Sequence, residues 1–282
     1  VAMIQSVTVN EIEISYEVFG DGSKTLILIA GGGNQMLEWS ESFCQQFVEH
    51  DFRVIRFDNR DVGTSSKLEN DEADPYTLDD MADDVAGLIR HIADEPVHVL
   101  GGSMGGMIAQ RLAIRHAELV ATLCLYISTT GNAALFKPSA SMDALMTPLS
   151  ENPYEYIDQR VELDRILSGT AFEFDESTKR RSRLEALERC DDRAGQARHG
   201  RAFMLGIEES AYQNHAQNLR KLKLPVAVIQ GGADDLFDTD HGAGFVSLIP
   251  GASYKVIDGL GHELPKEVWA VLVDAVVGFA DD

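Results

Sequence analysis

A single serine lies among glycines in the stretch GGSMG, which is centred on Ser103. The apolar run Val97–Leu100 precedes it, and an apolar segment with helical spacing follows it. A serine between a buried strand and a helix occupies a tight, strained turn that exposes its hydroxyl, and the backbones around Gly101 and Gly105 must pass close together. In this context the G-x-S-x-G spacing indicates a nucleophilic serine. The helix N-terminus that follows would stabilise negative charge that develops beside it.

A serine hydroxyl is a weak nucleophile unless a positioned base takes its proton and an acid orients that base. In this strand-turn-helix context the chain order is serine, acid, histidine. His262 lies in a glycine-flanked loop, DGLGHELP, directly after the last expected strand, and it is the predicted base. The other histidines lie in helical, charged or strand segments and are not expected to meet the serine: His50, His91, His98, His116, His199, His215 and His241.

The acid of this arrangement is expected after the apolar run Val226–Ile229, where the chain reads QGGADDLFDTD. Four aspartates compete in that loop. Asp234 lies nearest the end of the strand and is the predicted acid, with Asp235 as the fallback. The two later aspartates are more typical of a solvated loop. The other place for an acid follows Ile127, and that segment reads Ser-Thr-Thr, without a carboxylate.

Backbone N–H groups complete such a site, because a developing oxyanion needs two donors. One donor is expected from Met104, the residue after the serine. The other is expected from the loop after Ile29, where IAGGGN lets the backbone approach a ligand. Gly32 is the predicted donor there, within one residue. These motifs require neither a cofactor nor a metal, and none is predicted.

Apolar runs alternate with helical segments along the chain, which is typical of a parallel sheet covered by helices on both faces. A hairpin of half-buried strands is expected first, within residues 4–18. The expected buried strands are Leu26–Ile29, Phe52–Phe57, Val97–Leu100, Val120–Ile127, Val226–Ile229 and Tyr254–Ile257. The expected helices are about Trp39–Val48, Leu78–Ile92, the segment from the serine turn to His116, His241–Leu248 and Glu267–Phe279.

The alternation lapses between about residues 131 and 224. This predicts an α/β core from residues 1–130 and 225–282, with a helical cap inserted at 131–224. The basic run STKRRSRLEALER, residues 177–189, either meets an acidic substrate or partner or forms a solvated helix face, the commoner outcome. Six hydrophobic residues of the insertion either line a pocket or serve as plain packing: Met142, Leu145, Met146, Phe172, Phe203 and Met204.

The 282 residues include 46 acidic and 24 basic side chains, a formal net charge of −22. Such a surface repels phosphate backbones and anionic lipids, so nucleic acid and membrane are not expected as partners. The expected partner is a small-molecule ester, which would be the substrate, and the protein is expected to be a monomer or a homodimer. Three scattered cysteines argue against a disulfide framework or a zinc site. The N-terminal segment lacks the pattern of a signal peptide, so a cytoplasmic location is predicted.

Five segments, in this order, resemble the α/β-hydrolase fold superfamily: LILIAGGG, RVIRFDNRDVGTSS, VHVLGGSMGGMIAQ, PVAVIQGGADD and DGLGHELP. Two segments are similar to the aclacinomycin methylesterases within it, which remove a methyl ester from an anthracycline polyketide. These are FDNRDVGTSS, with Asp61 where many relatives have glycine, and RILSGTAFEFDE in the insertion. The chain departs from the superfamily at Ala30-Gly31, where His-Gly is frequent. That histidine is not catalytic, so the departure bears on the geometry of the oxyanion loop and not on activity.

This resemblance implies a serine esterase with a mostly parallel sheet and a helical cap over the active site. It places the catalytic triad on Ser103, Asp234 and His262, and the oxyanion donors on Gly32 and Met104.

A carboxylic ester hydrolase that works through an acyl-enzyme is therefore the leading interpretation. Lactonase, thioesterase, C–C bond hydrolase and cofactor-free haloperoxidase or perhydrolase share the same triad and stay open as alternatives. Haloalkane dehalogenases and epoxide hydrolases are disfavoured, because both use an aspartate at the position of Ser103. A non-catalytic small-ligand receptor is the alternative from another class, and an intact triad argues against it.

Overall fold

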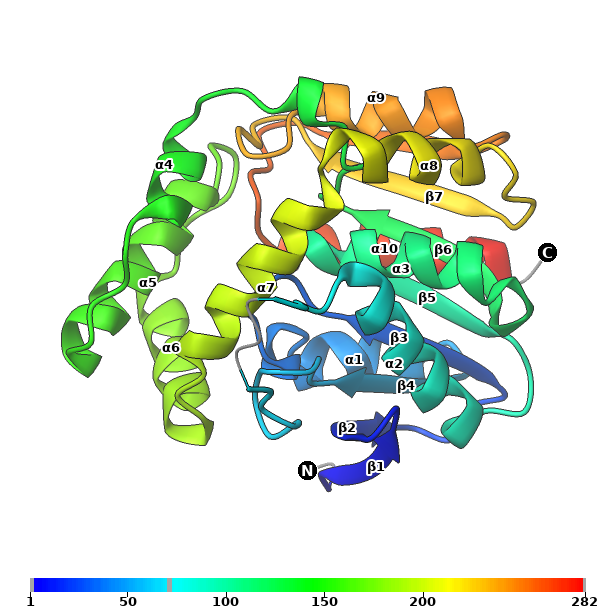
Figure 1. Ribbon diagram of the computed structural model, residues 1–282, viewed down its shortest axis with the longest axis horizontal. Helices are drawn as coiled ribbons and strands as arrows, with labels where there is room; N and C mark the ends of the chain where they lie inside the picture. The colour runs from blue at the N-terminus through cyan, green and yellow to red at the C-terminus, as the bar shows by residue number, and fades with distance from the viewer. Residues whose placement is uncertain (1–2, 70–72, 281–282) are drawn as a thin grey trace.

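An eight-stranded sheet forms the centre of the structure, a computed structural model that describes residues 3–69 and 73–280 (Figure 1). The strand order is β1-β2-β4-β3-β5-β6-β7-β8. The pairs β1–β2 and β2–β4 are antiparallel at one edge, and the pairs from β4–β3 to β7–β8 are parallel. The strands are β1 (Gln5–Val9), β2 (Ile12–Phe19), β3 (Lys24–Ile29), β4 (Phe52–Phe57), β5 (Val97–Gly102), β6 (Val120–Tyr126), β7 (Val226–Gly231) and β8 (Ser253–Ile257).

Helices cover both faces of this sheet. Side chains of α1 and α10 pack on one face, and those of α2, α3, α8 and α9 pack on the other. None of the helices in the described part of the chain is both long and apolar enough to cross a membrane. The helices are α1 (Glu41–Val48), α2 (Leu78–Ile92), α3 (Met104–Arg115), α4 (Ala140–Met146), α5 (Pro153–Leu167), α6 (Glu176–Arg189), α7 (Arg193–Gly206), α8 (Glu209–Leu219), α9 (Thr239–Leu248) and α10 (Trp269–Ala280).

The predicted α/β class with a mostly parallel sheet is confirmed. The run Leu26–Ile29 in β3 is fully buried, because helices cover the sheet on both faces and leave no solvent side for polar residues. The expected strand Val120–Ile127 ends one residue earlier, at Tyr126. Its last expected residue, Ile127, has a φ of 40°, a left-handed conformation that a strand cannot accommodate.

The segment between β6 and β7 contains α4 to α8, and its residues 131–224 are named the helical insertion below. In Figure 1, α4, α5 and α6 lie away from the sheet at one side, and α7 leads back toward it. The last helix, α8, packs on the core through Ala216 and Leu219. The part of the insertion that lies beyond the sheet is therefore α4 to α6, and α7 connects it to the core through the buried Ala202.

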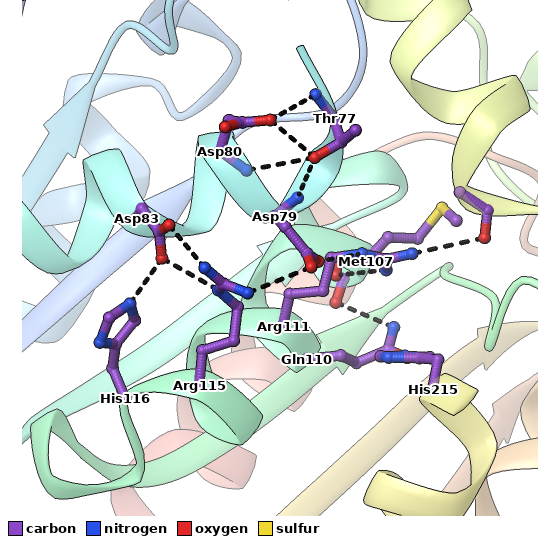
Figure 2. Close-up of polar contacts among 12 residues, drawn as sticks. Thr77, Asp79, Asp80, Asp83, Met107, Gln110, Arg111, Arg115, His116 and His215 are labelled. Carbon is purple, nitrogen blue, oxygen red and sulfur yellow. Dashed lines mark hydrogen bonds and ion pairs between the residues drawn. The ribbon is translucent and has the colours of Figure 1, made fainter. Parts of the chain in front are cut away.

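Polar side chains tie α2 to α3 (Figure 2). Asp79 accepts from Arg111 and Arg115, each at 3.2 Å, and Asp83 pairs with Arg115 at 2.7 Å and His116 at 2.7 Å. The guanidinium of Arg115 holds the pKa of Asp83 below its ordinary value, against the opposing effect of burial. These polar contacts join α2 to the C-terminal half of α3, the helix that begins at the serine turn.

His215 in α8 is buried against α3 (Figure 2). The side-chain amide of Gln110 donates to the carbonyls of Gly106 and Thr129, so its oxygen is left to accept. His215 Nε2 lies 2.9 Å from that oxygen and therefore carries the ring proton. Burial lowers the pKa of His215 to about 3, so the ring stays neutral in the folded protein.

This depressed pKa predicts a loss of stability in mild acid. In the unfolded protein, His215 takes up a proton near pH 6.5, whereas in the folded protein it does not. The contribution of His215 to the free energy of unfolding is therefore complete above pH 6.5 and falls as the pH drops toward 3. The variant His215→Gln keeps a donor for Gln110 but cannot titrate. Between pH 7 and pH 5 we expect the free energy of unfolding of the wild type to fall by about 2 kcal/mol relative to the variant. Urea unfolding at both pH values measures this; a constant difference would contradict it.

Candidate active site

Ser103 lies in the sharp turn between β5 and α3, with φ 52° and ψ −124°. Left-handed backbone is costly for a residue with a side chain, so the surroundings must impose it. Hydrogen bonds do so on both sides: the Ser103 N–H donates to Tyr126 O at 2.9 Å, and Ser128 Oγ donates to Ser103 O at 2.7 Å.

Small residues around Ser103 permit this turn. A Cβ on Gly101 would lie 2.5 Å from Gly105 O, and a Cβ on Gly105 would lie 2.1 Å from Ile29 O. Both contacts are with backbone atoms, which cannot move aside as a flexible side chain can. The close approach expected from the sequence two residues before and after the serine is present.

Ser103, His262 and Asp234 form a continuous chain of hydrogen bonds, although they come from loops after β5, β8 and β7. His262 Nε2 lies 2.8 Å from Ser103 Oγ, and His262 Nδ1 lies 2.8 Å from Asp234 Oδ2. With Nδ1 donating to the carboxylate, Nε2 is left to accept from the serine hydroxyl. This arrangement can remove a proton from Ser103.

Asp234 is held by the loop after β7. Its Oδ1 accepts from the N–H groups of Leu236 at 3.0 Å and Phe237 at 2.9 Å, which turns Oδ2 toward the histidine. The fallback, Asp235, points instead to α4, where it accepts from Ser141. The two later aspartates of the loop, Asp238 and Asp240, both pair with Lys137.

Several other histidines form hydrogen bonds with residues of the core rather than with Ser103. His98 bonds to Thr122 at 2.8 Å, His116 to Asp83 at 2.7 Å and His241 to Thr129 at 2.8 Å. His199 contacts the loop after β3, a contact that the sequence did not indicate.

Gly32 and Met104 lie against each other beside the serine. A Cβ on Gly32 would be 3.2 Å from the Met104 sulfur. Gly32 is exposed, whereas its neighbours Gly31 and Gly33 are buried. Among the described residues, neither the Gly32 N–H nor the Met104 N–H has an acceptor, and Met104 is the first residue of α3. Both donors are therefore available to a bound group.

The loop of His262 is joined to the helical insertion. The His262 N–H donates to Leu167 O at 2.6 Å, and Gly169 forms an antiparallel bridge with Leu260. A Cβ on Gly261 would lie 2.1 Å from Leu167 O, so the two segments are in direct backbone contact. The end of α5 consequently helps to hold the histidine.

An open cavity of about 2180 Å³ lies between the helical insertion and the core, and Ser103 and His262 both line it. Phe136, Phe203 and Phe237 form an aromatic wall: the rings of Phe203 and Phe237 are stacked at 6.2 Å, and Phe237 meets the His262 ring edge-on at 5.1 Å. Five of the six hydrophobic residues singled out from the sequence also line the cavity: Met142, Leu145, Met146, Phe203 and Met204. The sixth, Phe172, packs against the core cluster of α1 and α10.

The basic run predicted from the sequence forms α6, which borders the same cavity. Four of its five cations are paired with carboxylates of the protein, and Arg181 donates to the Thr178 hydroxyl. Lys179 lies 2.7 Å from Glu263, Arg180 lies 2.7 Å from Asp158, and Arg183 binds Asp164 with two nitrogens. These pairs attach α6 to α5 and to the residue after His262.

Glu38, at the edge of the cavity, is a site residue that the sequence analysis missed. Its Oε2 accepts from the Gly31 N–H at 2.7 Å, and its Oε1 accepts from Asn34 Nδ2 at 3.0 Å. The surrounding protein strips water from this carboxylate and raises its pKa, while the Gly31 hydrogen bond and Arg183 oppose the rise. Glu38 stands seven residues after Gly31, and no motif marks it.

In the described part of the chain, no group of three or more His, Cys, Asp or Glu side chains could hold a metal ion.

Residues 24–267 match the family model described as the alpha/beta hydrolase fold, and the chain belongs to this family.

Within that family, the chain is similar to rhodomycin D methylesterase DnrP of Streptomyces peucetius, with 28% identity over 96% of this chain and 95% of the relative. It is also similar to a 2-hydroxy-6-oxononadienedioate/2-hydroxy-6-oxononatrienedioate hydrolase of Paraburkholderia phymatum, with 26% identity over 89% and 85%. Among solved structures, the esterase EaEST of Exiguobacterium antarcticum superposes with a TM-score of 0.76 at 18% identity, over 99% of this chain and 98% of that one.

The close packing at the serine turn predicts that Gly105→Ala destabilises the protein. The added methyl group would meet Ile29 O at 2.1 Å, and the backbone of β3 would have to shift. We expect a loss of about 3 kcal/mol or more in the free energy of unfolding. As a control, Gly278→Ala in α10 meets open space and should be neutral or stabilise by up to about 1 kcal/mol. Equal urea midpoints for the two variants would contradict this.

Proposed function

We propose that this protein is a serine carboxylic ester hydrolase that uses Ser103, His262 and Asp234 as its catalytic triad. The observation that carries the proposal is the unbroken chain of hydrogen bonds from Asp234 Oδ2 through the His262 ring to Ser103 Oγ, with steps of 2.8 Å, at the wall of a large cavity. The methylesterase name of a relative that matches nearly the whole chain supports an ester as the substrate.

In the proposed reaction, His262 takes the proton of Ser103 as Oγ attacks the ester carbonyl carbon. The N–H groups of Gly32 and Met104 bind the resulting oxyanion. His262 then protonates the leaving alcohol, which departs and leaves an acyl-serine. Water, deprotonated by the same histidine, attacks this acyl group and releases the acid. Asp234 orients the ring and stabilises its cationic form.

The helical insertion acts as a cap in this proposal, because its helices α4 to α7 supply the side of the cavity that faces the serine. A C–C bond hydrolase is the second candidate, favoured by the similarity to a hydrolase named for oxononadienedioate substrates. The two functions share the triad and differ in the bond that breaks. Turnover of simple esters alone does not separate them. A 2-hydroxy-6-oxo-dienedioate, whose C–C bond would be cleaved, should therefore be assayed as a substrate alongside the esters.

The triad is tested with p-nitrophenyl acetate and the variants Ser103→Ala and Asp234→Asn. We expect Ser103→Ala to lose at least about 10³-fold in kcat, because the nucleophile is gone, and Asp234→Asn to lose up to about 10⁴-fold. Asp235→Asn is the matched control, since that carboxylate faces Ser141 and should leave kcat within about threefold. Turnover by Ser103→Ala at the wild-type rate would exclude the proposed mechanism.

The aromatic wall predicts a preference for apolar acyl chains or rings. Phe203→Ala should lower kcat/KM for p-nitrophenyl octanoate by about 10- to 100-fold, the effect of losing about 1.5–3 kcal/mol of apolar contact. The acetate ester reaches less of the wall and should change by less than about threefold. Phe172→Ala is the control, because this ring packs on the core and does not line the cavity. An equal loss on both esters would argue that Phe203 only stabilises the fold.

A further inference from the structure

Three consecutive glycines follow β3, and their N–H groups have different partners. The Gly31 N–H donates to Glu38 Oε2 at 2.7 Å, and the Gly33 N–H donates to His199 Nδ1 at 3.0 Å. Between them, the Gly32 N–H has no acceptor among the residues that the structure describes. Two side chains thus hold the outer peptide groups of the loop and leave the central one to face the cavity.

A loop of three glycines needs such restraints. Without side chains, it has many accessible conformations and loses the most conformational entropy when it is fixed. Gly33 adopts a φ of 69°, and a Cβ there would lie 3.0 Å from Gln196 in α7. The conformation that presents the Gly32 N–H is therefore imposed by the neighbours of the loop.

Glu38 is well placed to impose it. A Cβ on Gly31 would lie 3.3 Å from Ser103 Cβ and 3.6 Å from Glu38 Oε1, so this carboxylate is close to the proposed nucleophile. The second anchor of Glu38 is Asn34, whose side-chain oxygen accepts from Arg183 at 3.1 Å. The carboxylate is thereby connected both to the loop and to α6 of the helical insertion.

His199 restrains the other side from α7. Its Nε2 lies 2.7 Å from Arg60 O, and a carbonyl can only accept, so Nε2 carries the proton and Nδ1 accepts from Gly33. Burial lowers the pKa of His199 to about 4, which keeps Nδ1 unprotonated at neutral pH. The side chain is buried at the wall of the cavity, so its position is fixed by packing as well as by these two bonds.

We propose that Glu38 and His199 are positioning residues, which hold the triglycine loop so that the Gly32 N–H points at the developing oxyanion. The inference rests on the proposed function, because it needs a reaction in which an oxyanion forms. Neither side chain is assigned a contact with the reacting atoms. Because His199 belongs to α7, the helical insertion helps to hold the loop that supplies the oxyanion donor.

This role predicts a particular kinetic signature. An oxyanion donor acts on the transition state and contributes little to substrate binding, so loss of its position lowers kcat and leaves KM nearly unchanged. Removing one such donor costs about 10²- to 10³-fold in kcat, and a displaced donor should cost somewhat less. We expect Glu38→Ala and His199→Ala each to lose about 10- to 100-fold in kcat on p-nitrophenyl acetate.

Conservative variants distinguish positioning from a loss of packing. His199→Asn keeps an acceptor near the place of Nδ1 and should recover most of the activity that His199→Ala loses. In Glu38→Gln, the side-chain oxygen can still accept from the Gly31 N–H. The new NH₂ group faces the NH₂ group of Asn34, so the hydrogen bond to Asn34 is lost. Its kcat should therefore lie between those of the wild type and Glu38→Ala.

Two further variants serve as matched controls. His215→Ala removes another buried, neutral histidine, which contacts Gln110 and not the loop; it should destabilise the protein and leave kcat within about threefold. Glu49→Gln neutralises a carboxylate at the C-terminal end of α1, which does not line the cavity, and should also leave kcat unchanged. A similar loss of kcat in either control would overturn the specific role of Glu38 and His199.

The rate of labelling by a fluorophosphonate separates failure of this inference from failure of the proposed function. The reagent phosphonylates a reactive serine, and its phosphoryl oxygen needs the same N–H donors. Slow labelling of Glu38→Ala and His199→Ala beside fast labelling of the wild type would support the positioning role. Equal rates, or faster turnover by Glu38→Gln from the loss of a repelling charge, would overturn it. A wild type that is not labelled at all would overturn the proposed function, and the positioning role with it.

Discussion

The close contact between the backbones of the serine turn and β3 is the constraint on which the site depends. Ser103 takes a left-handed conformation because Gly101 and Gly105 let the end of β5 and the start of α3 pass within contact distance of each other and of Ile29. That geometry points Oγ away from the sheet and places the first N–H groups of α3 beside it. The same contact brings the triglycine loop after β3 to the serine, so the proposed nucleophile and both candidate oxyanion donors come from one packing arrangement.

The helical insertion supports this arrangement from two directions. At the end of α5, Leu167 O accepts from the His262 N–H, and residues 169–171 lie along the chain at 259–261. On α7, His199 accepts from the Gly33 N–H. Ion pairs add to these contacts: Asp61 is bound by Arg198 with two nitrogens, and Asp58 lies 2.6 Å from Arg189. Both the histidine loop and the triglycine loop thus depend on residues far away in the sequence.

Much of the fold and of the site followed from local patterns in the sequence. Buried runs such as Leu26–Ile29 indicate central strands because a sheet covered on both faces has no polar side. Ser103 and His262 were identifiable because glycines mark their turns. Glu38 and His199 carry no such mark, since their partners are backbone N–H groups that tertiary packing brings near. Phe172 and Phe203 have similar settings in the sequence, and only the packing of α7 places the second ring in the cavity and leaves the first on the core.

The position of the helical insertion in the sheet has a consequence for how such enzymes diversify. The strands β6 and β7 are adjacent and parallel, so a single crossover helix such as α8 would suffice to connect them. The additional helices α4 to α7 are in that sense removable, and exchange of this segment between relatives is an obvious route to new specificities. The bonds from Leu167 and His199 restrict that route. A segment exchanged from a relative must still supply hydrogen-bond partners for the histidine loop and the triglycine loop. An exchange that preserves turnover must therefore include these contact residues as well as the residues that line the cavity.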